Sequence, residues 1–156
     1  MHEGININIL TGPIQTGKTT SLIQWIKNRT DVYGILTPVI EGKRCFMDAY
    51  SKEIFSMEAI PNEENIIKVG KYNFSKPAFD RAIQILQDAS SQSQRWIIID
   101  EIGMLELNGQ GFDESLKKIL NKTKNFVEII LVIRESLLGP VLLKYGIKRY
   151  SLFDEK

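Results

Sequence analysis

The stretch Gly12-Pro13-Ile14-Gln15-Thr16-Gly17-Lys18-Thr19-Thr20 decides the fold that the sequence predicts. It matches the pattern G-x-x-x-x-G-K-[ST], in which a glycine-rich loop between a strand and a helix binds phosphate groups. The flanking segments provide that context, because residues 5–10 alternate apolar and polar side chains like a strand and residues 21–26 carry apolar side chains at helical spacing. We therefore expect a phosphate loop that binds a nucleoside triphosphate.

The residues of this loop suit the chemistry of a triphosphate. Gly12 and Gly17 allow backbone N–H groups to turn inward around the phosphates, and the start of the helix adds partial positive charge. Lys18 supplies a full charge and is a candidate catalytic residue, while the Thr19 hydroxyl is a candidate ligand of Mg²⁺, which prefers oxygen ligands. The residues expected to contact the nucleotide are Gly12, Pro13, Ile14, Gln15, Thr16, Gly17, Lys18, Thr19 and Thr20.

Length and composition indicate one domain. A chain of 156 residues, 43% of them hydrophobic, can bury one core and is too short for two ordinary domains, so we expect residues 1–156 to form a single domain. The net charge of +1 excludes a global field that would recruit nucleic acid or an anionic membrane.

The cysteine content and the apolar runs predict a cytoplasmic location. Cys45 is the only cysteine, which excludes an intramolecular disulfide and a Cys-rich metal site, and we expect it to pack within a strand. The chain begins without a signal-like segment, and its longest apolar run is far short of a membrane span.

Strands that alternate with helices predict an α/β phosphate-loop NTPase fold, with a mostly parallel central sheet and helices on both faces. Residues 44–57 depart from this alternation and predict an inserted antiparallel hairpin after a turn at Gly42-Lys43. We expect helices at 18–29, 112–120 and 137–145, and one more helix for which Ser75 is the N-terminal cap. Further strands are expected at 32–37, 66–69, 96–100, 126–133 and 147–152.

A second group of polar residues follows the most apolar of these strands, residues 96–99. Ligands of open α/β sheets lie beyond the carboxyl ends of the strands, so Asp100 should emerge beside Lys18 and Thr19 and hold Mg²⁺ through water. Glu101 can then orient or deprotonate a water that attacks the terminal phosphate. The alternative is structural, with Asp100 as a helix or turn cap and Glu101 as a solvated loop acid.

Two arginines are candidates for contact with the phosphoryl group. Arg134 follows the strand at 126–133, so the rule that places Asp100 also places this guanidinium near the site, as a catalytic residue. Arg44 is a weaker candidate for a nucleotide contact. The alternative for both is a solvated loop position, as is ordinary for an isolated arginine.

Other functional classes fit parts of the sequence. Residues 100–103 match the D-x-x-G of switch GTPases, but the nearest candidate for the guanine-reading N-K-x-D is Asn121-Lys122-Thr123-Lys124, which has lysine in place of aspartate. Small-molecule kinases begin with the same loop, yet they typically close an arginine-rich lid, and the connection after Ile133 offers only Arg134-Glu135-Ser136. A non-enzymatic module whose slow hydrolysis resets a conformation is the third alternative.

Four stretches together resemble the THEP1-like nucleoside triphosphatases, small phosphate-loop proteins related in fold to kinases and to additional-strand ATPases. They are residues 12–20, residues 34–37 with 42–44, residues 69–74 leading to Phe79, and residues 98–107, which are similar to the family signature I-D-E-I-G-x-M-E-L. The resemblance covers essentially the whole chain. It implies Mg²⁺-dependent hydrolysis of ATP, GTP and other nucleoside triphosphates to diphosphate and phosphate, with broad base tolerance.

Overall fold

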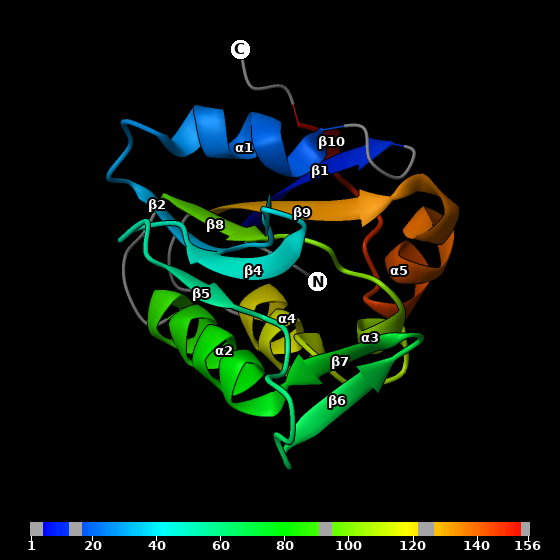
Figure 1. Cartoon of the computed structure of the whole chain (residues 1–156). Helices are drawn as coiled ribbons and strands as arrows, with labels where there is room; N and C mark the ends of the chain where they lie inside the picture. Colours follow the sequence, from blue (N-terminus) through cyan, green and yellow to red (C-terminus); the bar gives the residue numbers. More distant parts are fainter. Residues whose placement is uncertain (1–4, 13–16, 91–94, 122–126, 154–156) are drawn as a thin grey trace.

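A central sheet with helices on both of its faces forms most of the molecule (Figure 1). The computed structural model describes residues 5–12, 17–90, 95–121 and 127–153. The strands are β1 (Ile5–Gly12), β2 (Val32–Leu36), β3 (Val39–Ile40), β4 (Lys43–Asp48), β5 (Ile54–Ser56), β6 (Ile66–Val69), β7 (Tyr72–Ser75), β8 (Trp96–Ile99), β9 (Val127–Arg134) and β10 (Ser151–Leu152). The helices are α1 (Lys18–Ile26), α2 (Lys76–Ser90), α3 (Met104–Leu107), α4 (Asp113–Leu120) and α5 (Leu138–Lys144), the last preceded by the 3₁₀ turn η1 (Glu135–Leu137).

The strand order of the sheet is β10-β1-β9-β8-β2-β4-β3, and β5 pairs with β4. Strands β10, β1, β9, β8 and β2 are parallel, whereas β4 pairs antiparallel with β2, β3 and β5. The predicted mostly parallel sheet with an inserted antiparallel hairpin is therefore confirmed. Strand β9 lies between β1 and β8, and its last residue, Arg134, is the register partner of Gly12.

Side chains of the central strands alternate between two apolar cores. Ile97 and Ile99 of β8 pack into the larger core, on the face of the sheet that α2, α4 and α5 cover. Ile98 between them packs into the smaller core, on the face that α1 covers. Strand β9 divides its side chains in the same way. Burial on both faces explains why these strands are continuously apolar, and it leaves only their carboxyl ends for polar chemistry.

A glycine brings β2 close to β8. Gly34 has a φ of +114°, and a Cβ atom there would lie 2.1 Å from the Ile98 carbonyl oxygen, so the backbones approach within a distance that only glycine permits. Beyond this contact the Asp100 N–H donates to the Ile35 carbonyl oxygen at 3.1 Å. The end of β2 is thereby held beside Asp100.

Several boundaries differ from the predicted ones. Helix α1 ends at Ile26 rather than near Arg29, and the turn before β4 comprises Glu41 and Gly42, both with positive φ, as a two-residue hairpin turn requires. The short elements β3, β7 and α3 were not predicted. The predicted cap of α2 is present, because the Ala78 N–H donates to the Ser75 hydroxyl at 3.3 Å. None of the described helices is long and apolar enough to cross a membrane.

Candidate active site

The described part of the phosphate loop has the backbone that the sequence pattern requires. Gly17 adopts a left-handed conformation, with φ of +79°, directly before α1. The Lys18 Nζ atom donates to the Gly12 carbonyl oxygen at 3.4 Å, which places its ammonium group over the carboxyl end of β1. Thr20 is exposed in the first turn of α1, whereas Pro13, Ile14, Gln15 and Thr16 lie outside the described residues.

Asp100 lies against the first turn of α1, as the carboxyl-end rule predicts. Its side chain is completely buried, and its Oδ2 atom accepts hydrogen bonds from the Thr19 hydroxyl at 2.8 Å and the Thr37 backbone N–H at 2.9 Å. The other carboxylate oxygen, Oδ1, has no hydrogen-bond partner among the described residues, and neither has the Thr37 hydroxyl. Buried polar atoms are normally satisfied, so these two point to a ligand.

The electrostatics of Asp100 fit a cation. Burial raises its pKa to about 6 and the charge of Glu101 adds to that effect, against hydrogen bonds from Thr37 and Thr19 that lower it. The residues described contain no cluster of three or more His, Cys, Asp or Glu side chains that could hold a metal. Thr19 and Asp100 nevertheless offer the oxygen ligands that Mg²⁺ prefers, and Mg²⁺ usually completes its shell with waters and phosphate oxygens.

Glu101 follows in an unusual conformation. Its φ of +60° is uncommon for a residue other than glycine, and such outliers concentrate at functional sites. Its side chain is 48% exposed and forms an ion pair with Arg44, whose Nη1 lies 3.4 Å from Oε2. The Arg44 guanidinium also lies over the ring of Tyr72, 4.9 Å from its centroid. The predicted base and the weaker arginine candidate are therefore in contact.

A cavity of about 390 Å³ brings the predicted residues together. Its walls include Lys18, Arg44, Asp100, Glu101 and Arg134, which come from α1, β4, the end of β8 and the end of β9. Arg134 is exposed at the carboxyl end of β9, beside Gly12, as its place at the end of the apolar strand predicts. Chain segments far apart in sequence thus meet at one site.

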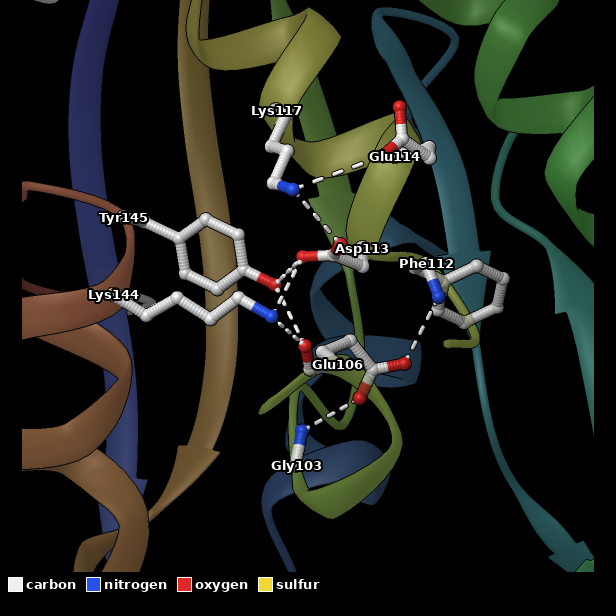
Figure 2. A network of polar contacts seen from close by, with 8 residues as sticks. All are labelled: Gly103, Glu106, Phe112, Asp113, Glu114, Lys117, Lys144 and Tyr145. Carbon is white, nitrogen blue, oxygen red and sulfur yellow. Dashed lines mark hydrogen bonds and ion pairs between the residues drawn. The ribbon is translucent and has the colours of Figure 1, made fainter. Parts of the chain in front are cut away.

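Sequence reasoning did not identify Glu106 as a structural centre of this site. Only 3% of this residue is exposed, and its two carboxylate oxygens accept backbone hydrogen bonds from Gly103 at 2.8 Å and Phe112 at 3.0 Å (Figure 2). Burial raises the Glu106 pKa to about 7, although both hydrogen bonds lower it. Gly111 packs so closely that a Cβ atom would lie 2.2 Å from the Glu106 Oε2. Glu106 therefore ties the segment after Glu101 to the start of α4.

Asp113 extends this arrangement toward α5 (Figure 2). Its carboxylate accepts a hydrogen bond from the Tyr145 hydroxyl at 2.6 Å and forms ion pairs at 3.1 Å with Lys117 and Lys144. Lys144 also donates to the Glu106 carbonyl oxygen. Burial alone would raise the Asp113 pKa, but these partners outweigh it and hold the pKa below its ordinary value. The available sequence signal was Glu106 within an otherwise apolar signature, followed by Asp113 at the start of a predicted helix.

Comparisons with known proteins identify solved structures with a similar fold. No match to the chain was found among curated proteins. The solution structure of a human cancer-related nucleoside triphosphatase has a similar fold, with a TM-score of 0.69 and 24% identity over 96% of this chain and 88% of that one. The crystal structure of THEP1 from the hyperthermophile Aquifex aeolicus also has a TM-score of 0.69, with 20% identity over 96% of this chain and 90% of that one.

The TM-scores and coverages establish a shared fold, and a family comparison adds the activity class. The family model described as NTPase matches residues 7–152. That match includes the phosphate loop, the acidic segment after β8 and the last strand of the sheet. The chain therefore belongs to the NTPase family of THEP1-like nucleoside triphosphatases.

Proposed function

We propose that the chain hydrolyses ATP, GTP and other nucleoside triphosphates to diphosphate and phosphate with Mg²⁺. The observation that carries this proposal is the environment of Asp100. Its buried Oδ1 has no partner among the described residues, while its Oδ2 is held by Thr19, the threonine of the phosphate loop. A carboxylate held in this way at the start of α1 suits a metal ion that also contacts phosphate.

Each residue of the site then has a role in phosphoryl transfer. Lys18 neutralises phosphate oxygens, and Thr19 and Asp100 hold Mg²⁺, which supplies charge neutralisation at the phosphates when bound. Glu101 orients a water molecule and accepts its proton as the water oxygen bonds to the γ-phosphorus. The bond from that phosphorus to the bridging oxygen breaks, and the diphosphate leaves with the electron pair.

The two arginines have different roles in this proposal. Arg134 lies at the end of β9 beside Gly12 and lines the cavity, which supports the proposal that its guanidinium stabilises charge on the transferring group. Arg44, which also lines the cavity, holds the Glu101 carboxylate through the 3.4 Å ion pair. We therefore assign Arg44 a positioning role rather than a direct contact with the nucleotide.

Base selectivity should be shallow. The sequence has no convincing guanine-reading motif, and residues 122–126, which include most of the nearest candidate, lie outside the described residues. The identified side chains serve the triphosphate that all substrates share. We expect kcat/KM to vary by less than about a hundredfold among ATP, GTP, CTP and UTP, which corresponds to roughly 2.7 kcal/mol.

Phosphate release from the purified protein tests the proposal. Each of the four nucleotides is supplied with excess Mg²⁺, and matched reactions contain EDTA instead. Steady turnover with Mg²⁺ and none with EDTA is the expected result. A single turnover that then stops would favour a regulatory module, and no phosphate release with any nucleotide would contradict the proposed activity.

A further inference from the structure

The cavity beside Glu101 is larger than hydrolysis requires. The attacking water occupies about 30 Å³ of liquid volume, whereas the cavity measures about 390 Å³. Pockets that bind small organic molecules range from about 300 to 1,000 Å³. The cavity is therefore in the size range of sites that hold an organic molecule, and its lining extends from Lys18 and Asp100 to Val69 and Tyr72.

Aromatic rings lie behind part of the lining of this cavity. Phe46, Phe79 and Phe112 form a cluster with ring centroids 5.0 Å apart for the first two and 5.9 Å apart for the last two. Tyr72 and Phe74 add a stacked pair with centroids 5.6 Å apart. The three phenylalanines of the cluster are themselves core residues with 0–4% exposure, so the apolar surface open to a ligand is that of the half-buried Val69, Tyr72 and Leu105 and the exposed Met104. A flat apolar ring would bury its surface there and pack beside the Tyr72 ring.

One wall of the cavity comes from the β6–β7 hairpin. This hairpin forms a sheet of its own apart from the central one (Figure 1). Val69, Lys71 and Tyr72, at the turn end of this hairpin, line the cavity. The connection after Ile133 comprises only Arg134-Glu135-Ser136 and has little material for the lid of a small-molecule kinase. In the structure a different segment of the chain, the β6–β7 hairpin, lines the cavity.

We propose that this cavity binds a hydroxyl-bearing aromatic small molecule as a phosphoryl acceptor. The proposal rests on the proposed function, since it uses the same phosphate site and Glu101. The acceptor oxygen attacks the γ-phosphorus in place of water, its O–P bond forms, and the bond to the bridging oxygen breaks. The diphosphate leaves with the electron pair, and the hydroxyl proton passes to the Glu101 carboxylate and then to solvent. The products are a phosphate monoester and the nucleoside diphosphate.

Binding is tested first, with 2-naphthalenemethanol and benzyl alcohol as two-ring and one-ring probes. Ligand-observed NMR titrations are run on the whole protein, alone and with saturating Mg²⁺·ADP. We expect saturable binding of the two-ring probe in the millimolar range or tighter, and we expect it to persist when nucleotide is bound. If nucleotide displaces the probe, the cavity holds the nucleotide's own base and the proposal is overturned.

Two tryptophan substitutions on β6 locate the probe. Val69→Trp fills the cavity and should weaken probe binding at least tenfold. Lys68→Trp places the same ring on the exposed neighbouring position, outside the cavity lining, and should leave binding and basal phosphate release within about twofold of the parent. Mg²⁺·ADP affinity, measured on the same Val69→Trp sample, reports whether that variant is folded. Equal probe binding by both variants would overturn the location.

Transfer is tested by the ratio of ADP to phosphate formed from ATP. Hydrolysis alone produces equal amounts, so any excess of ADP equals the phosphate monoester, which ³¹P NMR identifies directly. We expect this ratio to rise above one with at least one probe and to return to one in Val69→Trp. A ratio of one with both probes would overturn the acceptor role. If neither product forms in any reaction, the proposed hydrolysis itself fails, and the binding titrations still decide whether the cavity takes an aromatic ligand.

Discussion

Asp100 and Glu106 are both buried acids with raised pKa values, yet their surroundings differ in one respect. Glu106 has a backbone N–H donor for each carboxylate oxygen, whereas Asp100 has two donors on Oδ2 and none on Oδ1 among the described residues. A buried acid whose oxygens all accept hydrogen bonds stabilises the fold. A buried acid with an unsatisfied oxygen costs free energy until a ligand contacts that oxygen. The difference separates two regions. The phosphate region comprises Lys18, Thr19, Asp100, Glu101 and Arg134, and the structural region comprises Glu106 and Asp113 with their partners.

Substitutions in the two regions should affect different properties of the protein. Changes in the phosphate region should reduce turnover with little effect on the free energy of unfolding, because its polar groups face a cavity. Changes in the structural region should reduce the free energy of unfolding with little effect on turnover per folded molecule. The following variants test that separation.

Removing the charge of Lys18 should have the largest effect. In Lys18→Ala the phosphate loop keeps its N–H groups but loses the mobile positive charge, so turnover should fall below detection and triphosphate binding should weaken. Lys27→Ala, an exposed lysine at the end of α1, is the matched control. Phosphate release and equilibrium binding are measured together with thermal unfolding. Normal turnover in Lys18→Ala would mean that the phosphate site is wrongly assigned.

Glu101→Gln should follow. The amide keeps the size of the side chain but cannot accept the proton of water, so hydrolysis should slow by ~10²–10⁴, or about 3–5 kcal/mol in the barrier, while nucleotide affinity changes little. Glu114→Gln, whose parent side chain is 76% exposed on α4, is the control. Single-turnover hydrolysis and triphosphate binding are compared on one preparation. Unchanged hydrolysis would exclude Glu101 as the base, and a parallel loss of binding would place it in the scaffold.

Arg134→Ala should slow turnover by ~10³ if its guanidinium stabilises the transferring group. Arg149→Ala removes another exposed arginine, near the sheet edge at β10, and should have no effect. Steady-state kcat is the measurement for both. Turnover of Arg134→Ala within about threefold of the parent would return this residue to the solvated surface and shrink the phosphate region.

Glu106→Leu should lower the free energy of unfolding by about 1–3 kcal/mol, because it leaves the buried N–H groups of Gly103 and Phe112 without an acceptor. The folded-state pKa of about 7 lies above the ordinary 4.5, so the folded protein binds more protons between these values. The Glu106 contribution is therefore fully present below pH 4.5 and is lost as pH rises through 7. The difference in the free energy of unfolding between parent and variant should become smaller from pH 5 to pH 8.

Urea unfolding at each pH measures this difference, with Glu114→Leu on the exposed face of α4 as the control. Turnover corrected for the folded fraction should stay within about tenfold of the parent. A large loss of turnover with unchanged unfolding would break the comparison, because it would move Glu106 into the phosphate region.

The pH dependence of cation binding should be the smallest effect. A proton on Asp100 competes with the cation, and the pKa of about 6 lies above the ordinary 3.8, so affinity should fall about tenfold per pH unit below 6 and level off above it. Mn²⁺ binding in the presence of ADP, followed by electron paramagnetic resonance, reports it. Asp100→Asn is the control, because its pH dependence reports the titration of the nucleotide alone. Parallel curves of Mn²⁺ affinity against pH for parent and variant would contradict the assignment of Asp100 as a cation ligand.

The phosphate region could be largely predicted because its signals are local. A strand, a glycine loop and a helix follow one another in residues 5–26, and the apolar strand before Asp100 fixes the end of the sheet at which this acid lies. The structural region could not be predicted in this way. Glu106 is bound by backbone N–H groups and Asp113 by side chains of α5, and backbone donors carry no residue-type signature.

The missed elements have a similar cause. Strands β3 and β7 and helix α3 are too short for a periodic pattern, and each depends on a partner elsewhere, as β7 does on β6 and β3 on β4. The cavity combines walls from β4, the β6–β7 hairpin and the segment after β8. Its volume could not be foreseen from any of these segments alone.

The position of β9 has a consequence for biosynthesis. This strand lies between β1, which precedes the phosphate loop, and β8, which precedes Asp100. The two strands therefore cannot take their places in the sheet until residues 127–134 are available. A growing chain on the ribosome carries all the phosphate-loop residues long before it can align them with the acid. Nucleotide should therefore not assist folding of the nascent chain until late in synthesis, and products truncated before β9 should fail to bind it.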